Sequence, residues 1–273
     1  MRHLTLLAAA CLAALLLAAC AAPARLDATE QAQLAALLPA DVILLGEQHD
    51  APAHHRLERA TVQWLAARGA LAALVLEMAE QGHDTRALPR SASAAQVREA
   101  LAWDDHGWPW ADYGPVAMAA VRAGVPVLGG NLPRAALRET MADASRDALL
   151  DAGARERLTE AVREGHCGLL PAEQEPGMVR VQIGRDQSLA ATVTEALRPG
   201  QQVILLTGAQ HASRDRGVPL HLARQAPAPS VHVLIFGEQG HDLAADELRA
   251  ARFTPRPDPC EGLAQQLRRT PPV

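Results

Sequence analysis

The chain has 273 residues, of which 49% are hydrophobic, 21% are charged and only 3% are aromatic. Its formal net charge is −5, its basic residues other than histidine are all arginines, and no basic run occurs, which argues against nucleic acid as a partner. The length is sufficient for one large domain with a smaller subdomain.

Residues 1–19 have the organisation of a secretory signal peptide. Arg2 supplies positive charge, and the apolar run at 4–17 is too short to span a bilayer comfortably. The run ends in Leu17-Ala18-Ala19-Cys20, which resembles the lipobox of bacterial lipoproteins. That resemblance implies cleavage before Cys20, a lipid on its sulfur and an extracytoplasmic protein anchored at the outer membrane, with residues 20–30 as a lipidated tether. The alternative is an ordinary cleaved signal peptide in which Cys20 has no role.

Short apolar runs alternate with helical patterns along the rest of the chain. The runs predict five β-strands, at 42–45, 74–76, 125–128, 203–206 and 231–236. The spacing of apolar residues predicts helices at 53–67, 115–122 and 178–197. This alternation indicates an α/β fold, with a mainly parallel β-sheet flanked by helices.

One α/β domain is predicted over residues 31–253. Two stretches within it, at about 85–112 and 134–171, contain no clear strand and are predicted to form a smaller helical subdomain. Residues 254–273 are rich in proline and predict an irregular tail.

Two cysteines, Cys167 and Cys260, remain beyond the predicted lipid anchor. An extracytoplasmic location permits a disulfide between them, and free or structural thiols are equally compatible with the sequence. No CxxC motif or other compact metal-ligand spacing is present.

The pattern Gly-x-x-His occurs twice, as Gly46-Glu47-Gln48-His49 and Gly208-Ala209-Gln210-His211, each time after an apolar run. Because ligands of open parallel sheets bind outside the carboxyl ends of the strands, both histidines are expected in one cleft. Glu77 follows a second predicted strand and Asn131 a third. A carboxylate near an imidazole can bind a metal, orient the imidazole or transfer protons. The alternative for the first Glu-His pair by itself is two solvated loop residues.

An aromatic cluster lies in this aromatic-poor chain, made of Trp103, Trp108, Trp110 and Tyr113. Such clusters are most often a packed core, since aromatic side chains dominate burial. The alternative is a wall for a flat aromatic ligand, with the Tyr113 oxygen as an iron ligand. His54 and His55 begin a predicted helix and are expected to be surface or capping residues, unless one of them faces the cleft.

Taken in order, a set of short motifs resembles the ChaN-like haem-binding lipoprotein family. They are Leu44–Asp50 followed by His54-His55, Leu76-Glu77-Met78, Trp108–Pro115, Asn131-Leu132-Pro133-Arg134, His166-Cys167-Gly168, the set Met178, Gln182 and Arg185-Asp186, and Thr207–His211. The resemblance implies haem binding at a bacterial surface in iron acquisition, and haems stacked in a haem-bridged homodimer. It also implies a tyrosine ligand to the haem iron, which in this chain would be Tyr113, the only phenol.

The resemblance and the strand-end pattern together give the predicted haem-binding residues. These are Glu47, His49, Glu77, Tyr113, Asn131, Arg185 and His211.

The two Gly-x-x-His turns are also similar to a wider superfamily that includes the TIKI metalloproteases and erythromycin esterase-like enzymes. That similarity implies a metal-dependent hydrolase, using a divalent metal, in which the catalytic or metal-binding set is Glu47, His49, Glu77 and His211. No Gly-x-Ser-x-Gly or HExxH motif is present, which argues against a serine hydrolase or a zincin. A third interpretation is a non-catalytic lipoprotein that scaffolds a membrane assembly.

Overall fold

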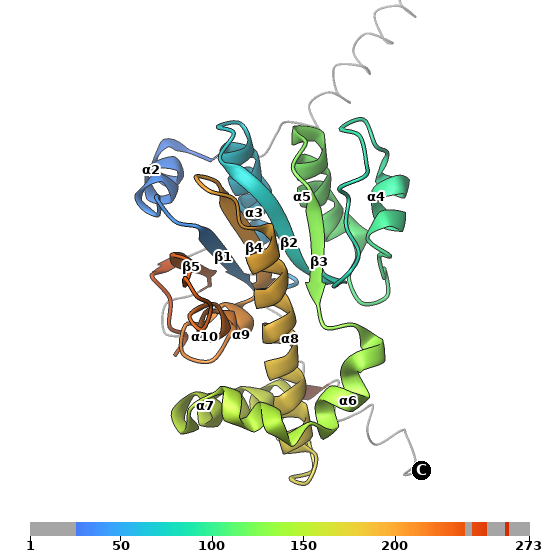
Figure 1. Ribbon diagram of the computed structural model, residues 1–273, viewed down its shortest axis with the longest axis vertical. Coiled ribbons are helices and arrows are strands. Elements are labelled where there is room, and N and C mark those ends of the chain that lie inside the picture. The colour runs from blue at the N-terminus through green and yellow to red at the C-terminus, as the bar shows by residue number, and fades with distance from the viewer. Residues whose placement is uncertain (1–25, 238–241, 250–259, 262–273) are drawn as a thin grey trace, which may run out of the picture.

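The computed structural model describes residues 26–237, 242–249 and 260–261 (Figure 1). The predicted signal peptide, Cys20 and all of the predicted tail except Cys260 and Glu261 lie outside the described residues. Within the described ranges, no helix combines the length and the apolar character needed to cross a lipid bilayer.

The described residues form one parallel sheet with the strand order β3-β2-β4-β1-β5-β6. The strands are β1 Val42–Glu47, β2 Leu71–Glu80, β3 Val127–Asn131, β4 Gln202–Gly208, β5 Val231–Phe236 and β6 Glu247–Arg249. The predicted parallel α/β fold is confirmed, and each of the five predicted strands is present. Strand β6 was not predicted, because it spans three residues with one apolar side chain.

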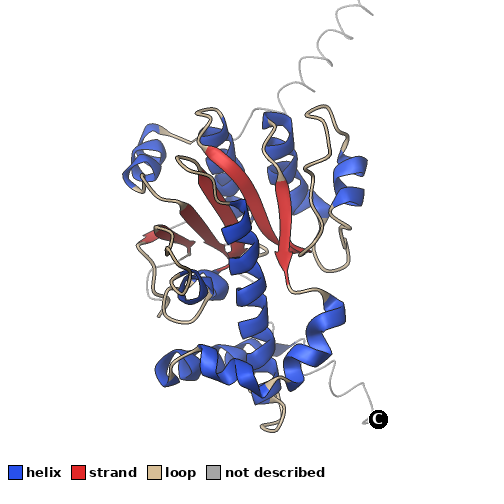
Figure 2. Ribbon diagram, in the orientation of Figure 1, coloured by secondary structure: helices blue, strands red, loops and turns tan. Residues whose placement is uncertain are grey.

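Helices cover both faces of the sheet (Figure 2). The helices are α2 Ala28–Ala36, α3 Pro52–Ala66, α4 Ala94–Ala100, α5 Trp110–Ala123, α6 Leu137–Ala142, α7 Ala152–Gly165, α8 Glu175–Ala196, α9 Ala209–Ala212 and α10 Val218–Leu222, with 3₁₀ turns η1 Arg134–Ala136 and η2 Ala144–Leu149. Helix α5 begins earlier than predicted, at Trp110, so Pro115 lies inside the helix and not in its first turn. The Trp110 amide donates to Asp105, which supports this earlier start.

Two hydrophobic cores lie on the opposite faces of the sheet. In β1, Ile43 and Leu45 face the core that contains α3 and α5, while Val42 and Leu44 face the core beneath α8 and α10. Successive strand residues point to opposite faces, and a strand buried on both faces is therefore apolar throughout. Each such buried aliphatic side chain stabilises the fold by about 1.5–3 kcal/mol. This double burial explains why the strands were visible as continuous apolar runs.

A third, separate core joins α7 to the first half of α8, below the sheet in Figure 1. Leu158 of α7 and Ile183 of α8 belong to it. The segment predicted at 134–171 therefore packs away from the main core, as a small helical part. The segment predicted at about 85–112 does not join it, because Val97 and Leu101 are buried in the main core with α5.

A disulfide joins Cys167 and Cys260, whose Cα atoms are 5.4 Å apart. Of the alternatives that the sequence left open, the structure shows the disulfide. It ties the turn that follows α7 to the C-terminal part of the chain, across a sequence separation of 93 residues.

Candidate functional site at the carboxyl edge of the sheet

The carboxyl ends of four strands bring the predicted polar residues to one edge of the sheet. The register pairs Glu47 of β1 with Gly208 of β4 and aligns β2 with β4, so that Glu77 lies beside Thr207. Asn131, at the end of β3, donates from Nδ2 to the main-chain oxygen of Glu77 at 2.8 Å. The structure thus gathers side chains that lie far apart in the sequence.

The two Gly-x-x-His glycines are needed because each makes room for the other copy of the motif. A Cβ on Gly208 would lie 2.7 Å from Nε2 of His49, and a Cβ on Gly46 would lie 2.8 Å from the Cβ of Ala212. Contacts this short do not occur between real Cβ atoms and their neighbours. The ring of His49 therefore rests against the second glycine, while α9, which carries His211, rests against the first.

Glu47 is the centre of a buried hydrogen-bond network. Its Oε1 lies 2.9 Å from Nδ1 of His49 and accepts from the hydroxyl of Tyr113 at 2.8 Å, while its Oε2 lies 3.1 Å from Nε2 of His55. Burial alone would raise the pKa of Glu47, but hydrogen bonds from His49 and His55 outweigh burial and bring the pKa to about 2. A carboxylate only accepts hydrogen bonds, so His49 carries its proton on Nδ1 towards Glu47.

Tyr113 is buried behind His49, with 1% of its surface exposed. Its hydroxyl donates to Glu47 and also lies 3.1 Å from the main-chain oxygen of His49. Burial and the negative charge of Glu47 raise the pKa of Tyr113 far above its usual value, so the hydroxyl stays protonated. This placement differs from the iron-ligand role that the resemblance implies, because a phenolate ligand must be deprotonated and open to iron. Ligation by Tyr113 stays a prediction that requires its bond to Glu47 to break.

A second carboxylate–histidine arrangement surrounds Glu77. Its Oε2 accepts from the hydroxyl of Thr207 at 2.6 Å and from the amide of Gly208 at 2.7 Å. His211 lies with Nδ1 2.6 Å from Asp186 and Nε2 3.8 Å from Glu77. Burial lowers the pKa of His211, but the charges of Asp186 and Glu77 overcome burial and raise the pKa to about 9. His211 is therefore an imidazolium at neutral pH.

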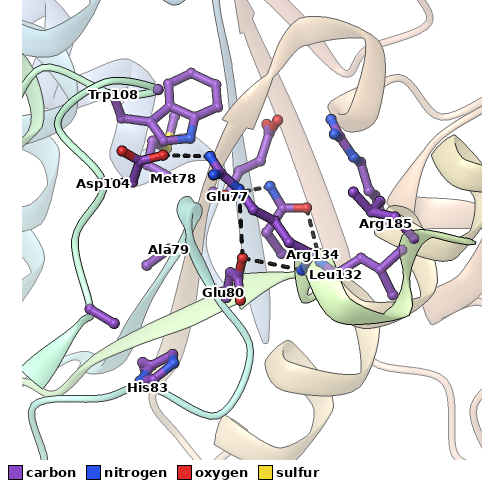
Figure 3. A pocket seen from close by; sticks show the side chains of 14 residues that line it. Glu77, Met78, Ala79, Glu80, His83, Asp104, Trp108, Leu132, Arg134 and Arg185 are labelled. Atoms are coloured by element: carbon purple, nitrogen blue, oxygen red, sulfur yellow. Dashed lines mark hydrogen bonds and ion pairs between the residues drawn. The ribbon is translucent and has the colours of Figure 1, made fainter.

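A cavity of about 420 Å³ lies beside Glu77 (Figure 3). Its apolar lining includes Met78, Trp108, Leu132 and Leu137, and its polar lining includes Glu77, Glu80, His83, Asp104, Asn131, Arg134 and Arg185. In Figure 3, Trp108 and Arg185 lie on opposite sides of the view, with Glu77 between them.

The two arginines of this cavity differ in their pairing. Arg134 pairs with Asp104, and its main-chain amide donates to Glu80 at 3.1 Å. Arg185 makes no such ion pair in the described part of the chain, and its Nε is buried without a hydrogen-bond partner. A buried guanidinium nitrogen without a partner is costly, so Arg185 is poised to meet an acceptor group.

The aromatic cluster serves in part as core and in part as cavity wall. Trp103 stacks edge to face on Trp110 at 5.0 Å between ring centroids, and both pack on the core that contains Tyr113. Trp108 lines the cavity and contacts the ring of His49 at 4.8 Å. Core packing therefore accounts for Trp103, Trp110 and Tyr113, and a ligand contact by Trp108 stays a prediction.

The expectation that His54 and His55 are surface residues is wrong. They are 2% and 9% exposed, because α3 packs its first turn beneath the turn that follows β1. His54 accepts from the amide of Gln48 at 3.0 Å, and His55 reaches Glu47. Sequence reasoning also missed Glu58, which is 0% exposed one turn further along α3. The available signal was a carboxylate on the apolar face of the predicted helix.

The geometry is that of a parallel α/β protein with a polar cleft at its strand ends. Residues 33–222, well over half of the chain, match the family described as haem-binding uptake, Tiki superfamily, ChaN. The chain therefore belongs to this family.

Of two similar solved structures, the first supports the same fold. The chain is similar to ChaN of Campylobacter jejuni, a structure described as showing cofacial haem binding, with a TM-score of 0.68 and 23% identity over 82% of this chain and 92% of the other. It is also similar to a mutant of the erythromycin esterase EreC in its open conformation, with a TM-score of 0.48 and 15% identity over 78% of this chain and 74% of the other. No curated protein sequence matches the chain.

Proposed function

We propose that this protein binds haem in the cavity beside Glu77. Two findings support the proposal: the family is described as haem-binding, and the similar Campylobacter jejuni protein binds haem. The observation that carries it is Arg185, a half-buried side chain whose Nε is buried without a hydrogen-bond partner among the described residues, on a cavity that Trp108 also lines. This combination suits a flat aromatic ligand that carries carboxylates.

The residues of the cavity fit haem by their chemistry. Its volume of about 420 Å³ is typical of small-molecule sites, and Met78, Trp108 and the two leucines supply apolar contact for a macrocycle. Arg185 and Arg134 can each form charge-assisted hydrogen bonds to a propionate. When bound, haem would supply an iron that takes ligands from the protein. His83 on the cavity wall and His49 beside Trp108 would offer imidazole nitrogens to it.

The remaining predicted haem-binding residues position the edge of the cavity in this proposal. Glu47 orients His49, and Asp186 orients His211. Asn131 donates to the main-chain oxygen of Glu77, and the hydroxyl of Thr207 donates to the side chain of Glu77. These hydrogen bonds are present without a ligand, and such preorganisation lowers the entropy cost of binding.

A hemin titration of soluble protein beginning at Ala21, followed by absorbance, tests the proposal. Saturable binding with a shifted Soret band is expected, and Arg185→Gln is expected to weaken it about 10- to 150-fold, because a hydrogen bond to a charged group contributes about 1.5–3 kcal/mol. Arg163→Gln is the matched control, since Arg163 pairs with Glu175 on the helical part remote from the cavity. Unchanged hemin affinity in Arg185→Gln would contradict this placement of haem.

The proposal extends to a lipid-anchored, extracytoplasmic protein at the bacterial outer membrane that handles haem in iron uptake. Its support is the signal sequence that ends in Leu17-Ala18-Ala19-Cys20. Full-length protein is expected in the membrane fraction with a lipid on Cys20, and Cys20→Ala is expected to release it. The soluble protein beginning at Ala21 tests the haem-bridged homodimer, when its size is measured by light scattering with and without hemin. Dimer formed only with hemin is the expected result.

A metal-dependent hydrolase is the second candidate function. The observation that favours it is the pair of histidines whose Nδ1 atoms face carboxylates, His49 with Glu47 and His211 with Asp186. Metal-ligating histidines are commonly oriented in this way. Stoichiometric divalent metal that is lost in both His49→Ala and His211→Ala would support the hydrolase, whereas metal-free protein with saturable hemin binding would oppose it.

A further inference from the structure

Three donor groups meet behind the haem cavity, at the base of the Glu47 network. They are a carboxylate oxygen of Glu47, a ring nitrogen of His55 and a carboxylate oxygen of Glu58, and all lie within 4.8 Å of one another. All three residues are buried, and none lines the cavity beside Glu77. The cluster is therefore separate from the proposed haem site.

Three carboxylate oxygens of this cluster are poorly satisfied among the described residues. Both oxygens of Glu58, which is 0% exposed, have no hydrogen-bond partner there, and Oε2 of Glu47 meets only the ring of His55, at 3.1 Å. Glu47 faces His49 and His55, but no basic group is paired with Glu58 among the described residues, and a second ionised carboxylate buried beside Glu47 is strongly unfavourable. A proton shared by Glu47 and Glu58 would satisfy one oxygen of each, but it would leave the second oxygen of Glu58 without a partner.

A divalent cation would satisfy all three oxygens and neutralise both carboxylates. Oε2 of Glu47 and Nε2 of His55 are 3.1 Å apart. Two ligands of a tetrahedral ion with bonds of about 2.0–2.1 Å are separated by about 3.3 Å, so this pair is spaced like one edge of a metal site. Glu58 can then close the site with one or both of its oxygens.

The donor types select the class of ion. An imidazole nitrogen with carboxylate oxygens suits zinc and its neighbours in the first transition row, whereas calcium and magnesium prefer oxygen ligands alone. We propose that Glu47, His55 and Glu58 bind one divalent transition-metal ion, apart from the cavity beside Glu77. The other oxygen of Glu47 remains bonded to His49 and Tyr113, so the carboxylate of Glu47 separates the ion from the cleft. This site does not depend on haem being the ligand of the cavity.

Metal binding without haem tests this inference. Soluble protein beginning at Ala21 is stripped with chelator, titrated with Co²⁺ and followed by visible absorption and by metal content after dialysis. One Co²⁺ per chain, displaced by Zn²⁺, is expected for the wild type. Glu58→Gln, which keeps the side-chain volume, and His55→Gln are each expected to lose it.

Two control variants separate this site from the edge of the cleft. His211→Gln and His83→Gln are expected to keep the Co²⁺ stoichiometry, because neither histidine reaches the cluster. Zn²⁺ at a hundredfold excess over Kd is also expected to stabilise the wild type by about 2.7 kcal/mol and so to raise its melting temperature. The melting temperature of Glu58→Gln is not expected to change. This readout replaces the titration if a variant folds poorly.

Three results would overturn the inference. The first is no bound Co²⁺ in the wild type, which leaves the shared proton as the explanation. The second is Co²⁺ binding that is unchanged in both Glu58→Gln and His55→Gln. The third is Co²⁺ lost in His211→Gln alone, which places the ion at the cleft. Because hemin is absent from these measurements, a failure here leaves the haem proposal standing, and a failure of hemin binding leaves this one standing.

Discussion

Replacing Tyr113 with phenylalanine isolates one buried hydrogen bond at the centre of the site. The hydroxyl of Tyr113 donates to Glu47 at 2.8 Å, and phenylalanine keeps the ring and its packing against Trp108. Glu47 Oε1 would still face Nδ1 of His49 at 2.9 Å, so no carboxylate oxygen becomes newly unpartnered. The substitution therefore removes the hydrogen bond to Glu47 together with the 3.1 Å contact between the hydroxyl and the main-chain oxygen of His49.

The expected cost is about 1.5–3 kcal/mol of unfolding free energy, the usual contribution of a buried hydrogen bond to a charged group. For a chain of this size, that corresponds to a decrease in melting temperature of about 3–12 °C. Urea denaturation and thermal denaturation both measure it. Thr194→Val is a suitable control, because the Thr194 hydroxyl donates to a neutral main-chain oxygen within α8 and is expected to contribute about 1 kcal/mol or less.

The same variant tests the two roles of Tyr113. If the hydroxyl of Tyr113 keeps its bond to Glu47 in the hemin complex, Tyr113→Phe is expected to keep the Soret maximum of that complex. Loss of a tyrosinate-type haem spectrum, with wild-type stability, would refute this reasoning and would show that Tyr113 leaves Glu47 to bind iron.

Three further results are expected. The pKa of His211 is raised to about 9 from its ordinary 6.5, so its ion pairs stabilise the fold fully below about pH 6.5, and this contribution, up to about 3 kcal/mol, is lost as the pH rises through 9. Urea denaturation at pH 6 and pH 9.5 should show a smaller loss in His211→Gln than in the wild type, and equal losses would refute the raised pKa. Gly208→Ala should displace the ring of His49 at a cost of about 0.5–1.5 kcal/mol, and thereby weaken hemin binding about 2- to 12-fold. Circular dichroism should show that the fold is retained. Unchanged hemin affinity would mean that His49 does not contribute to hemin binding. Reduction of the disulfide between Cys167 and Cys260 should lower the unfolding free energy by about 2–5 kcal/mol, which denaturation with and without reductant would measure. In a Cys167→Ser, Cys260→Ser double variant, the unfolding free energy should be the same with and without reductant.

Much of the fold was predictable because its signals are local. Strands β1 and β4 are covered on both faces, so their sequences are almost continuously apolar and stand out from the helices between them. The helical segments at 85–112 and 134–171 have no such signal of placement. Their periodicity shows an apolar face but not the surface on which that face packs, and only one of them joins the separate core of α7 and α8.

The candidate site was predictable in part for the same reason. Glu47, Glu77 and the two Gly-x-x-His turns follow apolar strands, and a parallel sheet must place such positions at a single edge. The partners of these residues were not predictable. Asp186 lies on α8, and its contact with His211 depends on how that helix crosses the sheet.

The sequence by itself determined the positions of five apolar strands along the chain, the polar residues that end them and the two glycines beside them. It did so because burial on two faces and the turn at a strand end are properties of neighbouring residues. Only the tertiary structure decided that Tyr113 lies buried against Glu47, that Glu58 and His55 face the same carboxylate, and that Arg185 reaches the cavity without a partner for its Nε. Each of these depends on the packing of a helix against the sheet, and a helix can present a polar residue to solvent or to the core with the same local sequence.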